Sequence, residues 1–252
     1  MPDPSHAPSA VPASVTVCVT SCGRLDLLTH TLESFRRFNP GGAYILSEDS
    51  AQPNVVEAIR AAFPEIRVLA GGARLGLMAS IDRLYSEVRT PYIFHLEDDW
   101  LFEGPVDWDG AIALLARRDD IANVSLRVFE EIKPKYRARS TPLAEHNRSF
   151  QIMKPNAHAE FFGWSPNPGL IRTSLYRQYA PFTRMNPDQM SALIKREGRV
   201  MAYLLPGVAR HIGQGRNAPD PTIPPRPKSR PAKMLRALKK RLYYAGLRKQ
   251  PY

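Results

Sequence analysis

The chain has 252 residues, of which 43% are hydrophobic, so it is long enough to bury the core of one large domain. Its formal net charge is +11, but ten Lys and Arg residues and no acidic residue lie between Arg226 and the C-terminus. The rest of the chain holds 25 basic and 24 acidic residues. This balance argues against nucleic-acid binding by the folded part of the chain, because a nucleic-acid-binding domain is expected to carry positive charge spread over its surface.

The two cysteines, Cys18 and Cys22, have no second pair elsewhere, which excludes a disulfide framework and a cysteine-based zinc site. The N-terminal residues lack the basic start and the apolar stretch of a signal peptide. No run approaches the roughly 18 apolar residues that a membrane span needs. We therefore expect a cytoplasmic protein.

Strands and helices alternate through the first hundred residues. Residues 1–13, rich in Pro, Ser and Ala, are expected to be disordered. Apolar periodicity then predicts, in chain order, a strand over 14–20, a helix from 25 that stops at 39, a strand over 43–46, a helix capped by Asn54, a strand over 66–69, a helix over 77–88 and a strand from 92. This order predicts an α/β fold with a mostly parallel sheet and helices on both faces.

The second half of the chain is less regular. We expect a helix over 108–118, a strand over 121–129, a helix over 188–196 and a strand over 199–205, whereas residues 130–159 fit no element. The segment 161–171 mixes aromatic residues with Pro and Gly, as in the wall or lid of a site. Six of the residues 219–231 are proline, which predicts an extended linker, and 233–247 reads as a basic helix with an apolar stripe.

Acidic residues follow two of the predicted strands. Glu48 and Asp49 end the second strand, and Glu97, Asp98 and Asp99 end the fourth. The carboxyl ends of parallel strands meet at one edge of a sheet, where ligands bind. Adjacent carboxylates repel one another and are costly beside a buried strand, so a divalent cation is the first candidate for their partner. The alternative is a solvated acidic turn.

The order of these segments resembles the GT-A fold of nucleotide-sugar-dependent glycosyltransferases, most closely the family 2 type, over residues 14–213. The turn Thr20-Ser21-Cys22-Gly23-Arg24 is similar to the family's turn after the first strand, and Arg74-Leu75-Gly76 to its turn before the third helix. Glu48-Asp49 matches the acidic pair that reads the nucleobase. Glu97-Asp98-Asp99 resembles the D-x-D element, although it opens with Glu, and His211 matches a late metal-ligating histidine.

The resemblance implies a GT-A domain over 14–217, with a nucleotide-binding half (14–104) and an acceptor half (105–217). A Pro-rich linker (218–231) and a basic tail (232–252) follow. The resemblance also implies that Asp99, Glu97 and His211 hold Mn²⁺ or Mg²⁺. An imidazole ligand favours Mn²⁺. The implied contacts to the nucleotide-sugar are Thr20, Ser21, Arg24, Glu48, Asp49, Gly76, Ser80, Glu97 and Asp98.

The implied activity is transfer of a sugar from a UDP- or GDP-linked donor to a hydroxyl of a glycan or lipid-linked acceptor. Because no second nucleophilic carboxylate is evident, we expect an inverting reaction. Asp188 matches the family's catalytic base and Glu160 is the second candidate, while Trp164 and Phe162 are candidates for stacking on the acceptor. Alternatively, Asp188 is a helix cap, the aromatic pair is core, and His211 is a surface residue.

Other functions remain open at this stage. A GT-A-like protein that binds a sugar nucleotide without turnover fits the imperfect motifs, whereas a nucleotidyltransferase would need a Gly-rich loop where only Gly23 stands. The tail is either a solubilising appendage or a peripheral anchor on the anionic inner face of a membrane. An anchor would suit a lipid-linked sugar or an envelope polysaccharide as acceptor.

Overall fold

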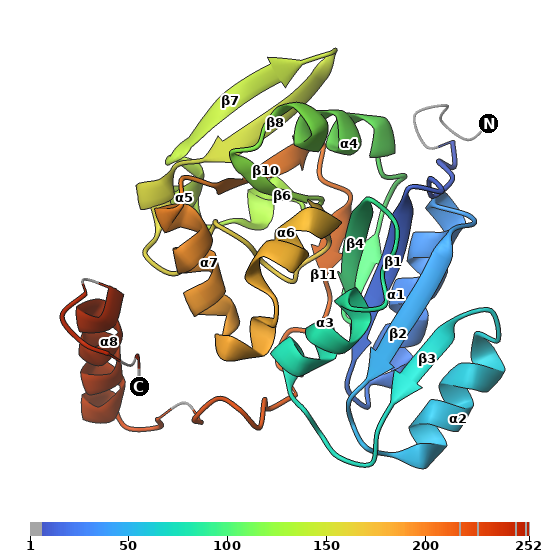
Figure 1. The fold of residues 1–252 in the computed structure, drawn as a ribbon, viewed down its shortest axis with the longest axis horizontal. Coiled ribbons are helices and arrows are strands. Elements are labelled where there is room, and N and C mark those ends of the chain that lie inside the picture. Colours follow the sequence, from blue (N-terminus) through green and yellow to red (C-terminus); the bar gives the residue numbers. More distant parts are fainter. Residues whose placement is uncertain (1–6, 217, 226, 245, 250, 252) are drawn as a thin grey trace. The chain divides into compact units, whose positions relative to one another are not determined.

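The structure is a computed structural model that describes residues 7–216, 218–225, 227–244, 246–249 and 251. The chain divides into two compact units, Met1–Ala218 and Pro219–Tyr252. Figure 1 shows the elements of both units. The first unit contains every strand of the described residues and all the residues that the sequence analysis assigned to a site.

A nine-stranded sheet in the order β3-β2-β1-β4-β9-β6-β10-β8-β7 forms the centre of the first unit. Strands β9 and β8 run against the others, so the sheet is mostly parallel, as expected. The strands are β1 (Val15–Ser21), β2 (Ala43–Glu48), β3 (Arg67–Ala70), β4 (Tyr92–Glu97), β6 (Ile121–Ser125), β7 (Ser140–Glu145), β8 (Arg148–Met153), β9 (Gly169–Arg172) and β10 (Val200–Leu205).

Helices cover both faces of this sheet because successive strand side chains point to opposite sides. On β1, Val17 and Val19 pack into one core with α1 (Leu25–Phe38), α2 (Pro53–Ala62) and α4 (Trp108–Arg117). Cys18 packs on the other face into a second core, with α3 (Leu77–Tyr85), α6 (Thr173–Tyr179) and α7 (Pro187–Arg196). This confirms the α/β architecture with helices on both faces.

The predicted strand over 121–129 ends at Ser125, and the segment 161–171, expected to form a wall or lid, contributes part of β9 to the sheet. Local structure differs from the expectations at three further places. Asn54 is not the cap of α2, because Gln52 is the N-cap and Pro53, with its fixed φ, opens the helix. Residues 140–153 form the hairpin β7–β8, whose turn residues His146 and Asn147 have φ of 52° and 58°, the positive values that a tight hairpin turn requires.

The third difference lies at the N-terminus, where residues 1–6 are outside the described part of the chain. Residues 7–13, expected to be disordered, run along the first unit. The amides of Ser9 and Val11 donate to the carbonyls of Phe38 and Pro40, at 2.8 and 3.0 Å, and the Val11 side chain is buried.

A second, two-stranded sheet pairs β5 (Trp100–Phe102) with β11 (Ala209–His211) in antiparallel register. His211 lies opposite Trp100, directly after the acidic residues. The short elements of this half are α5 (Pro134–Arg137) and the 3-10 helices Phe129–Glu131, Pro155–Ala157 and Phe182–Arg184.

The second unit contains α8 (Arg230–Tyr244), which begins and ends a few residues before the helix predicted over 233–247. In the part of the chain that the structure describes, no helix is both long and apolar enough to cross a membrane.

Candidate active site

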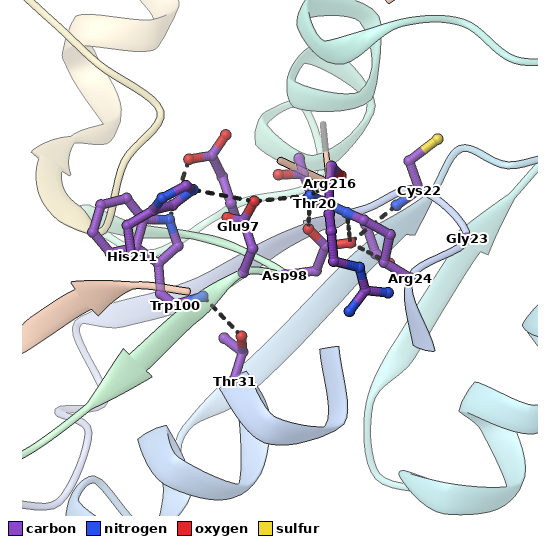
Figure 2. A network of polar contacts seen from close by, with 12 residues as sticks. Thr20, Cys22, Gly23, Arg24, Thr31, Glu97, Asp98, Trp100, His211 and Arg216 are labelled. Carbon is purple, nitrogen blue, oxygen red and sulfur yellow. Dashed lines mark hydrogen bonds and ion pairs between the residues drawn. The ribbon is translucent and has the colours of Figure 1, made fainter. Parts of the chain in front are cut away.

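The loop after β1 wraps around the carboxylate of Asp98, which is 1% exposed. Ser21 Oγ donates to Asp98 Oδ2 at 3.2 Å and the Cys22 amide donates at 3.3 Å. Arg24 donates to the same carboxylate through Nε, at 3.2 Å, and through Nη2 (Figure 2). Asp98 is thus held at the end of the sheet by groups from the neighbouring strand end.

The Asp99 carboxylate lies between two basic side chains. Arg24 Nη1 donates to Asp99 Oδ2 at 2.9 Å, and His211 Nε2 is 3.4 Å from the same oxygen. The segment after β11 closes over this residue: the Ile212 amide donates to the Asp99 carbonyl at 2.9 Å. A Cβ added to Gly213 would lie 2.7 Å from the Cβ of Asp99, so only glycine fits at this approach.

Glu97 turns to a different partner. Its Oε2 accepts a hydrogen bond from Trp100 Nε1 at 3.3 Å, and the Trp100 ring stands edge-on to His211. Burial, followed by the nearby Asp99 carboxylate, raises the pKa of Glu97 to about 8. The hydrogen bond from Trp100 and the charge of Arg24 oppose this rise.

Arg24 supplies the positive charge that makes these acids tolerable. Burial raises the pKa of Asp98 to about 6, and the charge of Arg24 and its hydrogen bonds oppose the rise. The sequence analysis assigned Arg24 to the donor nucleotide; in the structure its guanidinium is directed at Asp98 and Asp99. It also donates to the Arg216 carbonyl at 3.0 Å, and Arg216 pairs with Asp26.

Asp99 and His211 are close enough to be two ligands of one divalent metal ion. Ligand atoms that each lie about 2.1 Å from one octahedral ion are about 3 Å from each other, close to the 3.4 Å between Asp99 Oδ2 and His211 Nε2. Within the described ranges, no group of three or more His, Cys, Asp or Glu side chains is arranged to hold a metal. The expected set of Glu97, Asp99 and His211 is therefore not assembled, and Asp99 with His211 remains.

Glu48 and Asp49 shape the loops beside this site. Glu48 Oε1 accepts from the amides of Gly23, at 2.9 Å, and Ser50, at 2.8 Å. Asp49 accepts from the amides of Leu75 and Gly76 at 2.7 and 2.9 Å, immediately before α3. The two acids fix the turns that follow β1 and β3, so a nucleotide bound between these turns would meet backbone that they have positioned.

Thr20 and Ser80 are both buried. Thr20 Oγ1 lies 3.3 Å from His95 Nε2, and His95 Nδ1 lies 2.9 Å from the hydroxyl of Tyr85. Burial lowers the pKa of His95 to about 3, so this imidazole is neutral. The sequence analysis did not single out His95, because a histidine inside an apolar strand gives no signal of its partners.

All four candidates for catalysis and acceptor binding lie around one cavity of about 420 Å³. Asp188, Glu160, Phe162 and Trp164 line it together with Arg127 and others. The cap of α7 is Asn186, which forms a capping box with Gln189, so Asp188 is not the N-cap of this helix.

Arg127, which the sequence analysis missed, borders this cavity, and Lys195, which it also missed, holds the backbone that leads to Glu160. The Arg127 guanidinium lies 5.5 Å from the centre of the Trp100 ring, and Trp100 Nε1 donates to Glu97. Arg127 therefore links the cavity to the acidic cluster through Trp100. Lys195 donates to the carbonyls of His158 and, at 3.0 Å, Ala159, just before Glu160. Long-range contacts of this kind leave no local pattern in the sequence.

No protein-family model matches this chain, and a comparison with curated protein sequences also finds no match. Solved structures do resemble it. They include TarS 1–349 of S. aureus (TM-score 0.53, 11% identity, 75% of this chain and 57% of that chain) and GalNAc-T7 with UDP, GalNAc and Mn²⁺ (0.56, 13%, 92% and 48%). A third is the mannosyltransferase PcManGT from Pyrobaculum calidifontis with GDP-Man and Mn²⁺ (0.51, 12%, 99% and 67%).

This chain thus spans about half the length of the TarS and GalNAc-T7 chains that it resembles. Sequence identities of 11–13% are too low to transfer the roles of individual residues, so these structures are evidence for the fold alone. Together with the sheet order and the acidic strand ends, they show that this chain has the GT-A fold of glycosyltransferases.

Proposed function

We propose that this protein is a metal-dependent glycosyltransferase of the hexosyltransferase type. It would move a sugar from a UDP- or GDP-linked donor to a hydroxyl of a glycan or lipid-linked acceptor, with inversion. The observation that carries the proposal is the pair Asp99 and His211 at the carboxyl edge of a GT-A sheet. Trp100 and Arg127 link this pair to a cavity that the carboxylates of Glu131, Glu160 and Asp188 line.

For the donor, we place the nucleoside against the turns fixed by Glu48 and Asp49, and the diphosphate near Asp98 and Asp99. Backbone at these turns is pre-organised because its amides donate hydrogen bonds to buried carboxylates, so it needs little reordering when a ligand binds. The UDP and GDP-Man in the GalNAc-T7 and PcManGT structures motivate the choice of nucleobases to test.

We assign Asp99 and His211 as ligands of Mn²⁺ or Mg²⁺, with Glu97 as a further carboxylate beside them. A divalent ion bound there supplies positive charge where negative charge builds on the leaving diphosphate. The chain's own contribution is to hold the two ligands with β5 and β11. Arg24, which donates to Asp99 Oδ2, compensates its charge when no metal is present.

For the acceptor, we place the sugar in the cavity against Trp164 and Phe162, with Asp188 as the base and Glu160 as the second candidate. The acceptor oxygen forms a bond to the anomeric carbon while the bond to the phosphate oxygen breaks. The bonding pair leaves with the diphosphate, and the carboxylate accepts the hydroxyl proton. Attack from the face opposite the leaving group gives inversion.

Thermal unfolding with UDP, GDP or CMP, each with and without Mn²⁺, tests the donor site. A ligand at a hundred times its Kd adds about 2.7 kcal/mol, or roughly 5–10 °C in Tm for this size. We expect a shift that needs one nucleotide together with Mn²⁺ and is lost in Asp99→Asn. Asp120→Asn, the same change at an exposed ion pair with Arg118, should keep the shift. No shift with any pair would refute the assignment.

Turnover separates an enzyme from a protein that only binds sugar nucleotides. With the donor identified, Asp188→Asn is expected to lower kcat by about 10²–10⁴ while the nucleotide-dependent Tm shift remains. If Glu160→Gln has that effect instead, the roles of the two carboxylates are exchanged. A nucleotide shift without hydrolysis or transfer would assign a binding protein.

We propose the cytoplasm as the compartment. Cys18 and Cys22 are both free thiols, one buried and one half-buried, as suits a reducing environment.

A further inference from the structure

Exposed apolar side chains gather in the second unit. Among the described residues, the large hydrophobic side chains that are exposed are Leu75 and Phe161 in the first unit and five between residues 234 and 247. Four of these lie on α8, where Met234, Leu235, Leu238 and Leu242 are 74%, 53%, 53% and 36% exposed. A soluble surface normally scatters such residues, so their concentration on one helix needs a partner.

The four side chains form a single stripe. Residues 234, 235, 238 and 242 are spaced by one, three and four positions, which places them within about a third of the helix circumference. No described residue of α8 is buried. The helix is therefore amphipathic, with its apolar stripe in contact with solvent.

Cations occupy the remainder of the helix. Six basic residues lie on α8: Arg230, Lys233, Arg236, Lys239, Lys240 and Arg241. They are part of the ten cations that follow residue 225 without an acidic residue. Since like charges at this density repel one another, the segment is complementary to a dense array of negative charge.

We propose that α8 binds the surface of an anionic phospholipid bilayer, with its axis in the plane of the interface. The apolar stripe enters the boundary between headgroups and acyl chains, and the flanking cations contact lipid phosphates. The combination of the two features decides the partner: a nucleic acid would neutralise the cations but leave the leucines in water. A bilayer satisfies both.

The position of α8 behind a Pro-rich segment fits this role. Ser229 directly precedes the helix, and its carbonyl accepts from the Lys233 amide at 3.0 Å. Arg236 donates to the carbonyls of Pro224 and Pro225 at 3.1 and 2.9 Å, which fixes this cation toward its own linker. Arg236 is therefore left unchanged in the variants below.

Vesicle co-sedimentation of the full chain tests the proposal. We compare phosphatidylcholine vesicles that contain about a third phosphatidylglycerol with pure phosphatidylcholine, since anionic lipid supplies roughly a fivefold gain in binding per cation near the surface. We expect binding to the anionic vesicles, weakened by added salt, and little binding to the neutral ones. Absence of binding to the anionic vesicles would overturn the proposal.

Two variants separate the contributions of the stripe and the cations. Leu235→Ser with Leu238→Ser keeps the charge and is expected to weaken binding by about tenfold or more. Lys239→Gln with Lys240→Gln keeps the stripe and is expected to weaken it by roughly 25-fold at low salt. Binding that is unchanged by the leucine pair would overturn insertion of the stripe.

Controls exclude a general charge effect and a misfolded tail. Arg60→Gln with Arg89→Gln removes two exposed cations from the first unit and should leave vesicle binding unchanged. A Leu238→Trp variant should show blue-shifted fluorescence with anionic vesicles only; no shift would contradict burial of this position. Tighter binding to a DNA duplex than to vesicles, insensitive to the leucine pair, would assign nucleic acid instead. These measurements use no donor or acceptor, so their outcome is independent of the proposed function.

Discussion

Replacing Arg24 by glutamine is expected to destabilise the first unit strongly, because Arg24 is the counter-charge of a buried carboxylate. Asp98 is 1% exposed and would keep only the hydrogen bonds from Ser21 Oγ and the Cys22 amide. Removing one partner of a buried ion pair typically costs about 3–5 kcal/mol. We expect the free energy of unfolding to fall by about 3 kcal/mol, at the lower end of this range, because glutamine retains part of the arginine side chain. A loss of this size corresponds to a fall in Tm of roughly 6–12 °C.

Arg216→Gln is the matched control. Arg216 belongs to the same network, but its partner Asp26 and its own side chain are about half exposed. Exposed pairs are screened by solvent, so no measurable loss is expected. Thermal or urea unfolding at pH 7.5 without metal compares the two variants with the wild type.

A double variant tests whether Arg24 and Asp98 are coupled as a charge pair. Arg24→Gln with Asp98→Asn leaves no unpaired charge in the buried site, so it should be less destabilised than the sum of its two single changes. Additive effects, or equal losses in Arg24→Gln and Arg216→Gln, would show that Arg24 is not the counter-ion of Asp98.

Three further changes test the site and its surroundings. Gly213→Ala should push against Asp99 and weaken Mn²⁺-dependent nucleotide binding about tenfold or more in calorimetric titration, and an unchanged affinity would refute this close approach. Because burial lowers the pKa of Lys195 to about 8, the unfolded chain binds more protons between about pH 8 and 10.5. Unfolding stability should therefore rise with pH in this window relative to Lys195→Gln, and parallel curves would refute the shift. Asn186→Ala removes the cap of α7 and should cost about 1 kcal/mol in urea unfolding; a loss within error would contradict the capping role.

Much of the fold was predictable because it depends on local periodicity. The β-branched run at 14–20 and the apolar positions spaced by three and four each favour one element type. The predictions were wrong where a nearby residue favoured a different local structure from the expected one. Pro53 opened α2 in place of the expected Asn54 cap, and the turn at His146 and Asn147 made a hairpin from a segment with no clear pattern.

The candidate site was predictable in part. Acids at strand ends must gather at one edge of a parallel sheet, so the position of Asp98 and Asp99 followed from the order of elements. The side chains that pair with these carboxylates could not be predicted from the order of elements. The sequence analysis assigned Arg24 to the nucleotide, whereas the structure pairs it with both carboxylates, and Glu97 turns to Trp100.

By itself, the sequence determined the alternation of strands and helices, the placement of acids after two strands and the separation of a basic tail from a nearly neutral body. Each of these depends on neighbours in the chain. The tertiary structure alone decided which distant side chains meet. The antiparallel pairing of β11 with β5 brings His211 to Asp99, and α7, β10 and the segment 160–167 together line one cavity with Asp188, Glu160 and Trp164. Such contacts depend on strand register and on how the chain folds back, which no local pattern encodes.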